Sequence, residues 1–301
     1  MLLRICCAIV LFGGVIAAAE PTPLNVVPAV QSWAPAEGVL NVNLAGVAVS
    51  PADSKALKAV AEAFQAELKS VDIGRRGGRQ AAFLLTLEGG DAANPEGYTI
   101  EIGDRVTIRG STPTGIFYGT RTILQLLRQG KPLPKGTITD WPQYKHRMVM
   151  LDVGRKPFPM PVLKDHLRIL AWYKMNELHL HLSDEAFGGK YTGFRVECDT
   201  FPGLTSKDLF YTKKELREFQ EEAARMGITI TPEIDMPGHA RVFTDFWPDL
   251  KLANNSPSYL DVTNPATIER LKKLLDEMIP VFNAPDFHIG KDGRTFGAGK
   301  F

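Results

Sequence analysis

The chain has 301 residues, of which 44% are hydrophobic and 23% charged, and its formal net charge is +1. These values are ordinary for a globular protein with a buried core. A near-neutral chain has no field that would steer it towards nucleic acid or an anionic membrane, so neither is expected as a partner. The length suits two domains, or one large barrel with an appendage.

The first residues are typical of a secretory signal peptide. Arg4 precedes a short apolar run, and three alanines ending at Ala19 come before Glu20. A charged start, a short apolar stretch and small residues at its end describe such a peptide, although a buried N-terminal helix is the alternative. We therefore expect residues 1–19 to be removed and the mature chain to be exported, to the periplasm or the medium, with no membrane anchor. Cys198 is then the only thiol left, and we expect it to be structural.

Residues 20–138 are predicted to form a small α/β sandwich domain. Apolar residues at helical spacing predict helices over 54–69 and 114–127. Two alternating segments, 97–102 and 105–109, flank a Gly-Asp pair and predict a β-hairpin. A stretch rich in Lys, Pro and Gly, 130–136, predicts a linker to the next unit.

Residues 139–301 alternate between strand and helix patterns. The predicted strands are 147–153, 177–182, 228–231 (ending at Pro232) and 287–290, with helices between them and a long loop over 183–210. Thr212 followed by Glu215 has the spacing of a helix capping box. Four such units are half of a (β/α)8 barrel. The predicted fold class is therefore α/β, an N-terminal sandwich followed by an incomplete, truncated TIM barrel.

Ionisable residues gather where these predicted strands end. They are Asp152 and Arg155, Asp184 and Glu185, Glu233 with Asp235 and His239, and Asp292. In a parallel barrel the carboxyl ends of the strands form one rim, and catalysis takes place there. The pattern indicates an enzyme that acts on a polar substrate.

Three further residues admit two interpretations each. His179 and His181 share one face of a strand, which suits metal ligands supplemented by nearby acids and histidines. Alternatively, one of them forms hydrogen bonds inside the barrel and orients an acid. Arg147 could bind vicinal hydroxyls or a carboxylate of a substrate, or it could form a structural ion pair.

Five segments together resemble successive blocks of the family 20 glycoside hydrolases, the β-N-acetylhexosaminidases. The blocks are RMVMLDVGR at 147–155, KMNELHLHLSD at 174–184, FRVECDTFPGLT at 194–205, ITPEIDMPGH at 230–239 and HIGKD at 288–292. Residues 96–127 are similar to the end of that family's accessory α/β domain. The resemblance covers nearly all of the chain after residue 19.

The resemblance implies a specific chemistry. In that family the substrate's own acetamido carbonyl attacks the anomeric carbon, and terminal N-acetylhexosamine residues are released from glycans with retention. Asp292 would orient the acetamido group, and Arg147 would bind the sugar hydroxyls. A supporting shell would contain Asp184, Asp235, His239 and His288. No metal and no organic cofactor is implied.

The sequence departs from the family pattern at one catalytic position. The general-acid Glu expected directly after Asp292 is replaced by Gly293, and no barrel pattern follows it. We therefore expect a truncated chain with impaired catalysis. A non-catalytic sugar-binding remnant, assembled with another chain, is one alternative, and a metal-dependent hydrolase built on His179 and His181 is another. The sequence indicates no oligomeric state.

Overall fold

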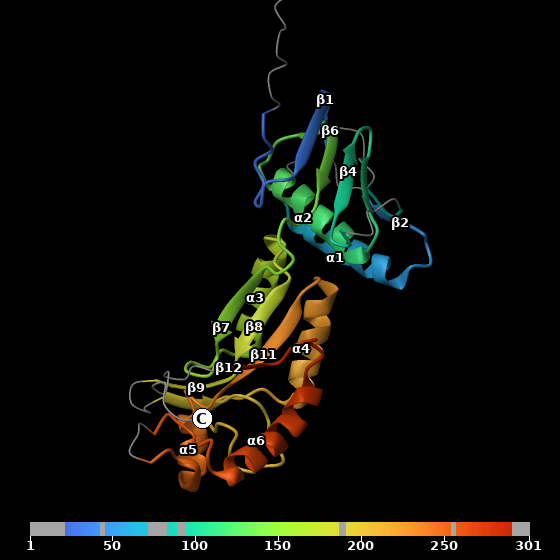
Figure 1. The fold of residues 1–301 in the computed structure, drawn as a ribbon. Coiled ribbons are helices and arrows are strands. Elements are labelled where there is room, and N and C mark those ends of the chain that lie inside the picture. The colour runs from blue at the N-terminus through green and yellow to red at the C-terminus, as the bar shows by residue number, and fades with distance from the viewer. Residues whose placement is uncertain are drawn as a thin grey trace, which may run out of the picture.

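The computed structural model describes residues 22–42, 46–71, 83–88, 94–186, 191–253 and 257–290. It has two units, each a sheet with helices packed against it (Figure 1). The expected signal peptide and the pair Asp292 and Gly293 lie outside the described residues. Among the described residues, none of the helices has the length and apolar character needed to cross a membrane.

The N-terminal unit is a mixed sheet in the order β1-β6-β4-β5-β3-β2. Its strands are β1 (Ser32–Leu40), β2 (Val47–Ser50), β3 (Phe83–Leu87), β4 (Tyr98–Ile102), β5 (Val106–Gly110) and β6 (Leu133–Asp140). β4 and β5 form the predicted antiparallel hairpin, with Ile100 opposite Ile108. Both of these isoleucines are fully buried, so the hairpin supplies the centre of this core.

β6 occupies most of the stretch that predicted a linker. It pairs with β1 on one side and with β4 on the other. Position 136 of this strand requires glycine, because a Cβ there would come within 2.5 Å of the Trp33 ring. The linker prediction is wrong: pairing on both sides satisfies the backbone of a segment whose composition is that of a loop. β6 also runs to Asp140, past the expected domain end at residue 138.

Two helices, α1 (Lys55–Ser70) and α2 (Pro113–Arg128), lie at the positions that the periodicity predicted. Side chains cap both, because Ser54 accepts a hydrogen bond from the Leu57 amide and Thr112 accepts one from the Gly115 amide. α2 is buried on nearly every side, whereas the sequence predicted one buried face. The reason is its position between the sheet and the second unit, where Gln125 donates a hydrogen bond to the Trp172 carbonyl at 3.0 Å.

The C-terminal unit is a parallel sheet in the order β12-β11-β8-β7. Its strands are β7 (Met148–Asp152), β8 (Glu177–His181), β11 (Thr229–Met236) and β12 (His288–Gly290). The helices between them are α3 (Met160–Trp172), α4 (Lys213–Arg225), the short α5 (Arg241–Phe246) and α6 (Pro265–Met278), with 3-10 turns at Pro248–Leu250 and Ile279–Val281. β8 and β11 pair in parallel, with Leu178 opposite Ile230, so the predicted topology is confirmed.

The two faces of this sheet differ in chemistry because side chains alternate along each strand. Leu178, Leu180 and Ile234 are fully buried on the face that the helices cover. His179, His181, Glu233 and Asp235 share the opposite, inner face. The sheet thus packs through one apolar face and carries ionisable side chains on the other.

Two local predictions for this unit are wrong. β11 does not end at Pro232 but continues to Met236, because its pairs with β8 stay in register through Glu233. The stretch predicted as a loop after β8 contains an antiparallel hairpin of β9 (Ser183–Ala186) and β10 (Tyr191–Phe194). The predicted capping box at the start of α4 is confirmed.

Candidate active site

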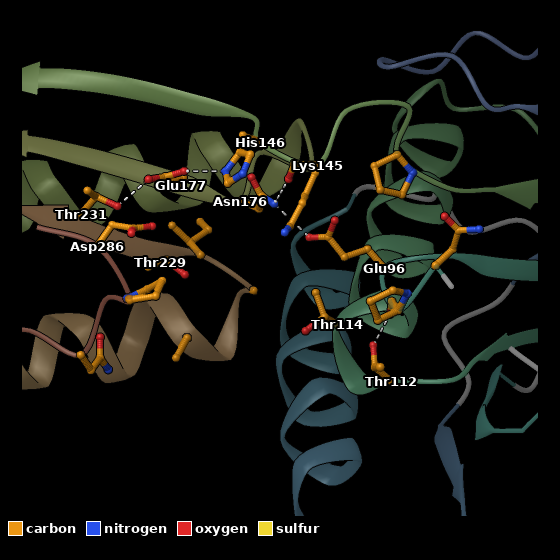
Figure 2. Close-up of a pocket in the computed structure, with 18 of the residues that line it drawn as sticks. Glu96, Thr112, Thr114, Lys145, His146, Asn176, Glu177, Thr229, Thr231 and Asp286 are labelled. Carbon is orange, nitrogen blue, oxygen red and sulfur yellow. Dashed lines mark hydrogen bonds and ion pairs between the residues drawn. The ribbon is translucent and has the colours of Figure 1, made fainter. Parts of the chain in front are cut away.

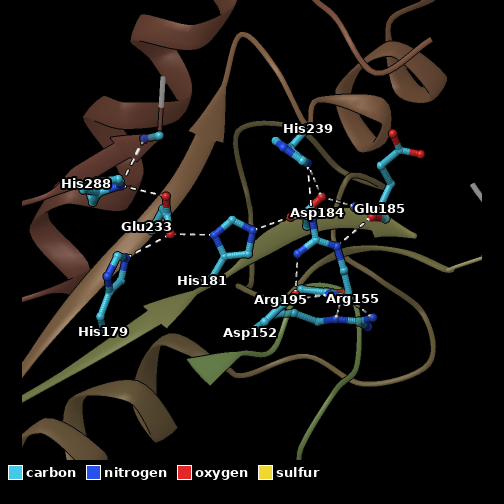
Figure 3. Close-up of polar contacts among 12 residues, drawn as sticks. Asp152, Arg155, His179, His181, Asp184, Glu185, Arg195, Glu233, His239 and His288 are labelled. Atoms are coloured by element: carbon cyan, nitrogen blue, oxygen red, sulfur yellow. Dashed lines mark hydrogen bonds and ion pairs between the residues drawn. The ribbon is translucent and has the colours of Figure 1, made fainter. Parts of the chain in front are cut away.

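A continuous network of polar side chains crosses the inner face of the parallel sheet and reaches the carboxyl ends of its strands. Figure 3 shows it running from His288 through Glu233 and His181 to Asp184, and then to Arg155 and His239. These residues come from four segments that are far apart in the sequence: 155, 181–184, 233–239 and 288.

Asp184, the second residue of β9, is the acceptor on which four donors converge. It lies 2.7 Å from Arg155 Nη2, 2.6 Å from His181 Nε2, 3.1 Å from His239 Nδ1 and 2.6 Å from the Glu185 amide nitrogen. Its side chain is only 1% exposed. Burial by itself would raise the pKa of Asp184, but these four donors outweigh burial and hold the pKa below its ordinary value. Asp184 is therefore a fixed carboxylate.

Arg155, in the loop after β7, is a partly solvent-exposed member of the network. Its guanidinium pairs with Asp152 at 2.6 Å and with Asp184 at 2.7 Å, and it donates to the Glu185 carbonyl at 2.9 Å. The side chain is 37% exposed. A rigid, half-exposed guanidinium held by two carboxylates is well placed to donate hydrogen bonds to a ligand.

His239 follows the Pro237-Gly238 turn at the end of β11, as the sequence predicted. Its φ of +50° is unusual for a residue with a side chain, so the turn holds it in a strained conformation. Its Nδ1 lies 3.1 Å from Asp184 Oδ1 and 3.3 Å from Arg155 Nη2, so an acceptor and a donor both face this nitrogen. The turn and the carboxylate together set the orientation of the ring.

Glu233 occupies the centre of the inner face and contacts three histidines. Its carboxylate lies 2.9 Å from His179 Nε2, 2.5 Å from His181 Nδ1 and 2.7 Å from His288 Nδ1. Burial raises the pKa of Glu233, but the contacts with His179 and His181 outweigh it and hold the pKa far below the ordinary value. Sequence analysis placed Glu233 near the rim but gave it no role.

Asp235 is 2% exposed and packs directly against Gly290 of β12. A Cβ at Gly290 would lie 1.6 Å from Asp235 Oδ1, and the φ of Gly290 is +76°. Only glycine fits at position 290, so β11 and β12 approach each other closely here. Asp292 follows two residues later, outside the described residues. The structure thus brings Asp184, Asp235, His239 and His288 to one side of one sheet.

Arg147 does not join them, and its expected place in the site is wrong. It directly precedes β7, so it lies at the amino end of the sheet, whereas Asp152 ends the same strand. Its guanidinium forms a two-point pair with Glu96 of the first unit, at 3.0 and 3.1 Å, and its Nε donates to the Lys174 carbonyl at 2.7 Å. Arg147 is a structural link between the units, which was the other interpretation, and Arg155 is the arginine at the rim.

A cavity of about 980 Å³ lies at that same amino end, between the two units (Figure 2). Its polar lining is largely paired, since Glu177 contacts His146 at 3.5 Å and Asn176 donates to both Glu96 and the Lys145 carbonyl. In parallel barrels this end serves stability and the carboxyl end serves chemistry. The polar network, not the cavity, is therefore the candidate active site.

Two sets of side chains bring three possible metal-ligand atoms within 4.8 Å of one another: His179 with Glu233 and His288, and Asp152 with His181 and Asp184. In both sets the histidine nitrogens lie next to carboxylates, although His179 Nε2, 2.9 Å from Glu233, makes no hydrogen bond within the described residues. His181 has a carboxylate oxygen within hydrogen-bond distance of each ring nitrogen. We assign no metal to either set, and the pairing of His179 with His181 as joint ligands has no support in this geometry.

Comparison with known proteins identifies the scaffold that carries this network. The model of the glycosyl hydrolase family 20 catalytic domain matches residues 144–297, and the model of domain 2 of that family matches residues 23–141. The chain belongs to glycosyl hydrolase family 20. Its parallel sheet is accordingly the first half of a TIM barrel, preceded by the family's domain 2.

Family 20 relatives are similar over most of this chain. Lacto-N-biosidase of Bifidobacterium bifidum is 30% identical over 284 residues, which are 90% of this chain and 24% of that protein. The β-N-acetylhexosaminidase structure of Streptomyces coelicolor has a TM-score of 0.77 at 28% identity, covering 91% of this chain and 61% of that one. A mutant β-hexosaminidase of Streptomyces plicatus in complex with the product GlcNAc matches with the same TM-score and covers 60% of that chain. The chain thus spans less than two thirds of each of these relatives.

Proposed function

We propose that this chain forms part of a β-N-acetylhexosaminidase-type glycosidase site, which takes a terminal N-acetylhexosamine residue of a glycan. The observation that carries the proposal is the convergence of Arg155 and His239 on the buried Asp184 carboxylate at the carboxyl rim of a family 20 sheet. GlcNAc as the product bound to a structural relative supports the same substrate class.

The geometry suggests what each group does. Arg155, half exposed, donates to sugar hydroxyls, and Asp184 with Asp152 holds its guanidinium in place. His239, held at Nδ1 by Asp184 and Arg155, completes the polar rim that receives the sugar. The family resemblance assigns Asp292 to the acetamido group, whose carbonyl attacks the anomeric carbon in place of an enzyme nucleophile.

Gly293 favours a second, related function, in which the chain binds the sugar but does not cleave it. Glycine has no carboxyl with which to protonate a leaving group, and general acid catalysis contributes roughly 10²–10⁴ in rate. We propose that the chain binds N-acetylhexosamine and that hydrolysis by this chain is impaired.

Calorimetric titration with GlcNAc tests the proposal. Arg155→Lys keeps the charge but loses the planar fork, so it should weaken binding by about tenfold or more, which corresponds to about 1.4 kcal/mol. Arg270→Lys is the matched control, because Arg270 pairs with Asp249 on the outer helix α6 and is similarly half exposed. Equal loss in both variants, or no binding by the parent chain, would contradict the proposed site.

We also propose that the mature chain is exported, on the basis of its first 19 residues. N-terminal sequencing of protein recovered from the periplasm or medium of an expression host should begin at Glu20. Recovery in the cytoplasm with Met1 intact would contradict export.

A further inference from the structure

His181 has an arrangement that the proposed chemistry does not use. The residue is 6% exposed, and each of its two ring nitrogens lies against a carboxylate: Nδ1 is 2.5 Å from Glu233 Oε2, and Nε2 is 2.6 Å from Asp184 Oδ2. Figure 3 shows the ring lying between these two acids. An ionised carboxylate can only accept hydrogen bonds, so each contact requires a proton on the nitrogen that faces it.

A protonated acid beside a neutral ring would satisfy one of these contacts, but the other donors argue against it. Asp184 accepts from Arg155, His239 and the Glu185 amide as well, and these donors converge on both of its oxygens. Glu233 receives contacts from His179 and His288 in addition to His181. A carboxyl proton on Asp184 would point at one of its donors or would displace it. Burial would raise the pKa of Glu233, but its contacts with His179 and His181 hold the pKa far below its ordinary value, so that this carboxyl also stays ionised.

The balance of charge leads to the same state. The groups that face His181 are Glu233 on β11, Asp184 on β9 and Asp152, its register partner on β7. Arg155 is the guanidinium paired with two of these three acids, and His179 and His288 contact Glu233. Asp235, buried on the same face, also interacts electrostatically with Arg155. A neutral His181 would leave four carboxylates with one guanidinium, whereas a cation at His181 reduces this excess of negative charge.

We propose that His181 is a standing imidazolium that positions Asp184, and through Asp184 sets the orientation of His239. The link is geometric. His181 and Arg155 hold Oδ2 of Asp184, which leaves Oδ1 to the Glu185 amide and to His239 Nδ1. His181 touches no substrate in this account and is a positioning residue, and this role rests on the proposed function of the rim.

The electrostatics agree with the geometry. Burial lowers the pKa of His181, but the hydrogen bonds to Asp184 and Glu233 outweigh it and raise the pKa to about 10. An exposed histidine such as His146, whose side chain is 72% exposed, has no such pair of partners.

Nitrogen-15 NMR of the histidine rings tests the proposal on the whole chain without any ligand. At pH 8 both nitrogens of His181 should have the chemical shifts of protonated imidazole nitrogens. Glu233→Gln should lower the pH at which His181 loses its proton by at least one unit. His181→Gln should change the Nδ1 shift of His239, whereas the control His146→Gln should leave it unchanged.

The outcomes separate this proposal from the proposed function. A bare nitrogen on His181 at pH 8, or a His239 shift that is the same in His181→Gln and the parent, would overturn the positioning role. If His181→Gln does not fold, the titration of His181 in Glu233→Gln still decides the charge state. Failure of the parent chain to bind GlcNAc, with His181 doubly protonated, would instead count against the proposed function alone.

Discussion

Removal of the Arg147 guanidinium should destabilise the protein and leave the rim intact. Arg147 makes a two-point pair with Glu96 at 3.0 and 3.1 Å and donates to the carbonyls of Lys174 and Tyr144 at 2.7 and 2.9 Å. The two charged side chains are 15% and 19% exposed. Removing one partner of a buried pair costs about 3–5 kcal/mol, and the partial exposure here reduces the expected cost for Arg147→Met to about 2–4 kcal/mol.

The assay is denaturant unfolding of the parent, Arg147→Met, Glu96→Gln and the double variant. Because the two side chains contact each other, the effects should be non-additive, with a coupling energy of about 1–3 kcal/mol. Arg109→Met is the matched control, since Arg109 pairs with the half-exposed Glu101 at the surface and should cost no more than about 1 kcal/mol. Arg147→Met should still bind GlcNAc at denaturant concentrations at which this variant remains folded. A loss of less than about 1 kcal/mol, or a loss of sugar binding equal to that of Arg155→Lys, would refute the assignment.

Four other outcomes are expected. Gly290→Ala should lower the unfolding free energy by about 2–5 kcal/mol, because its Cβ would overlap the Asp235 carboxylate at a φ of +76°; a neutral effect in denaturant melts would contradict the close strand approach. The pKa of His181 in the folded state, about 10, exceeds the ordinary histidine pKa of about 6.5. Protonated His181 therefore contributes its full stabilisation below about pH 6.5, and this stabilisation is lost as the pH rises through about 10. The unfolding free energy measured from pH 7 to 10 should fall more steeply in the parent than in His181→Gln, and equal slopes would contradict the raised pKa. We expect no release of phenol from an ordinary aryl N-acetylglucosaminide above the level of Asp292→Ala, because Gly293 has no carboxyl to protonate the leaving oxygen; release would show that another group supplies that proton. An apolar dye should bind the parent and bind less to Met150→Lys, since β7 leaves Met150 54% exposed; equal dye binding would place the apolar surface elsewhere.

The sequence predicted those parts of the fold that local signals determine. The capping box of Thr212 and Glu215 is a contact between near neighbours in the chain, and its spacing alone identified the start of α4. The strand β6 and the continuation of β11 past Pro232 depend instead on partners that are distant in sequence, and composition is a poor guide to such pairing. The all-round burial of α2 likewise depends on the docking of the second unit.

The same division holds for the candidate site. That acids and histidines end the strands was visible in the sequence, and the structure brings Asp184, Asp235 and His239 together. Arg147 stands five positions before Asp152, which is about 16 Å along a strand at 3.3 Å per residue, so the strand pattern alone separates it from the carboxyl rim. The two carboxylates on His181 could not be foreseen, since they depend on the register of β8 against β11 and on the hairpin after β8.

The central claim is that the carboxyl rim of the parallel sheet, and not the cavity between the two units, binds N-acetylhexosamine. Chemical-shift mapping of the labelled chain during titration with GlcNAc tests it most directly. The account predicts that the largest changes occur at Arg155, Asp184 and His239, with saturation. Changes centred on Lys145 and Asn176 in the cavity, or no saturable change at all, would contradict it.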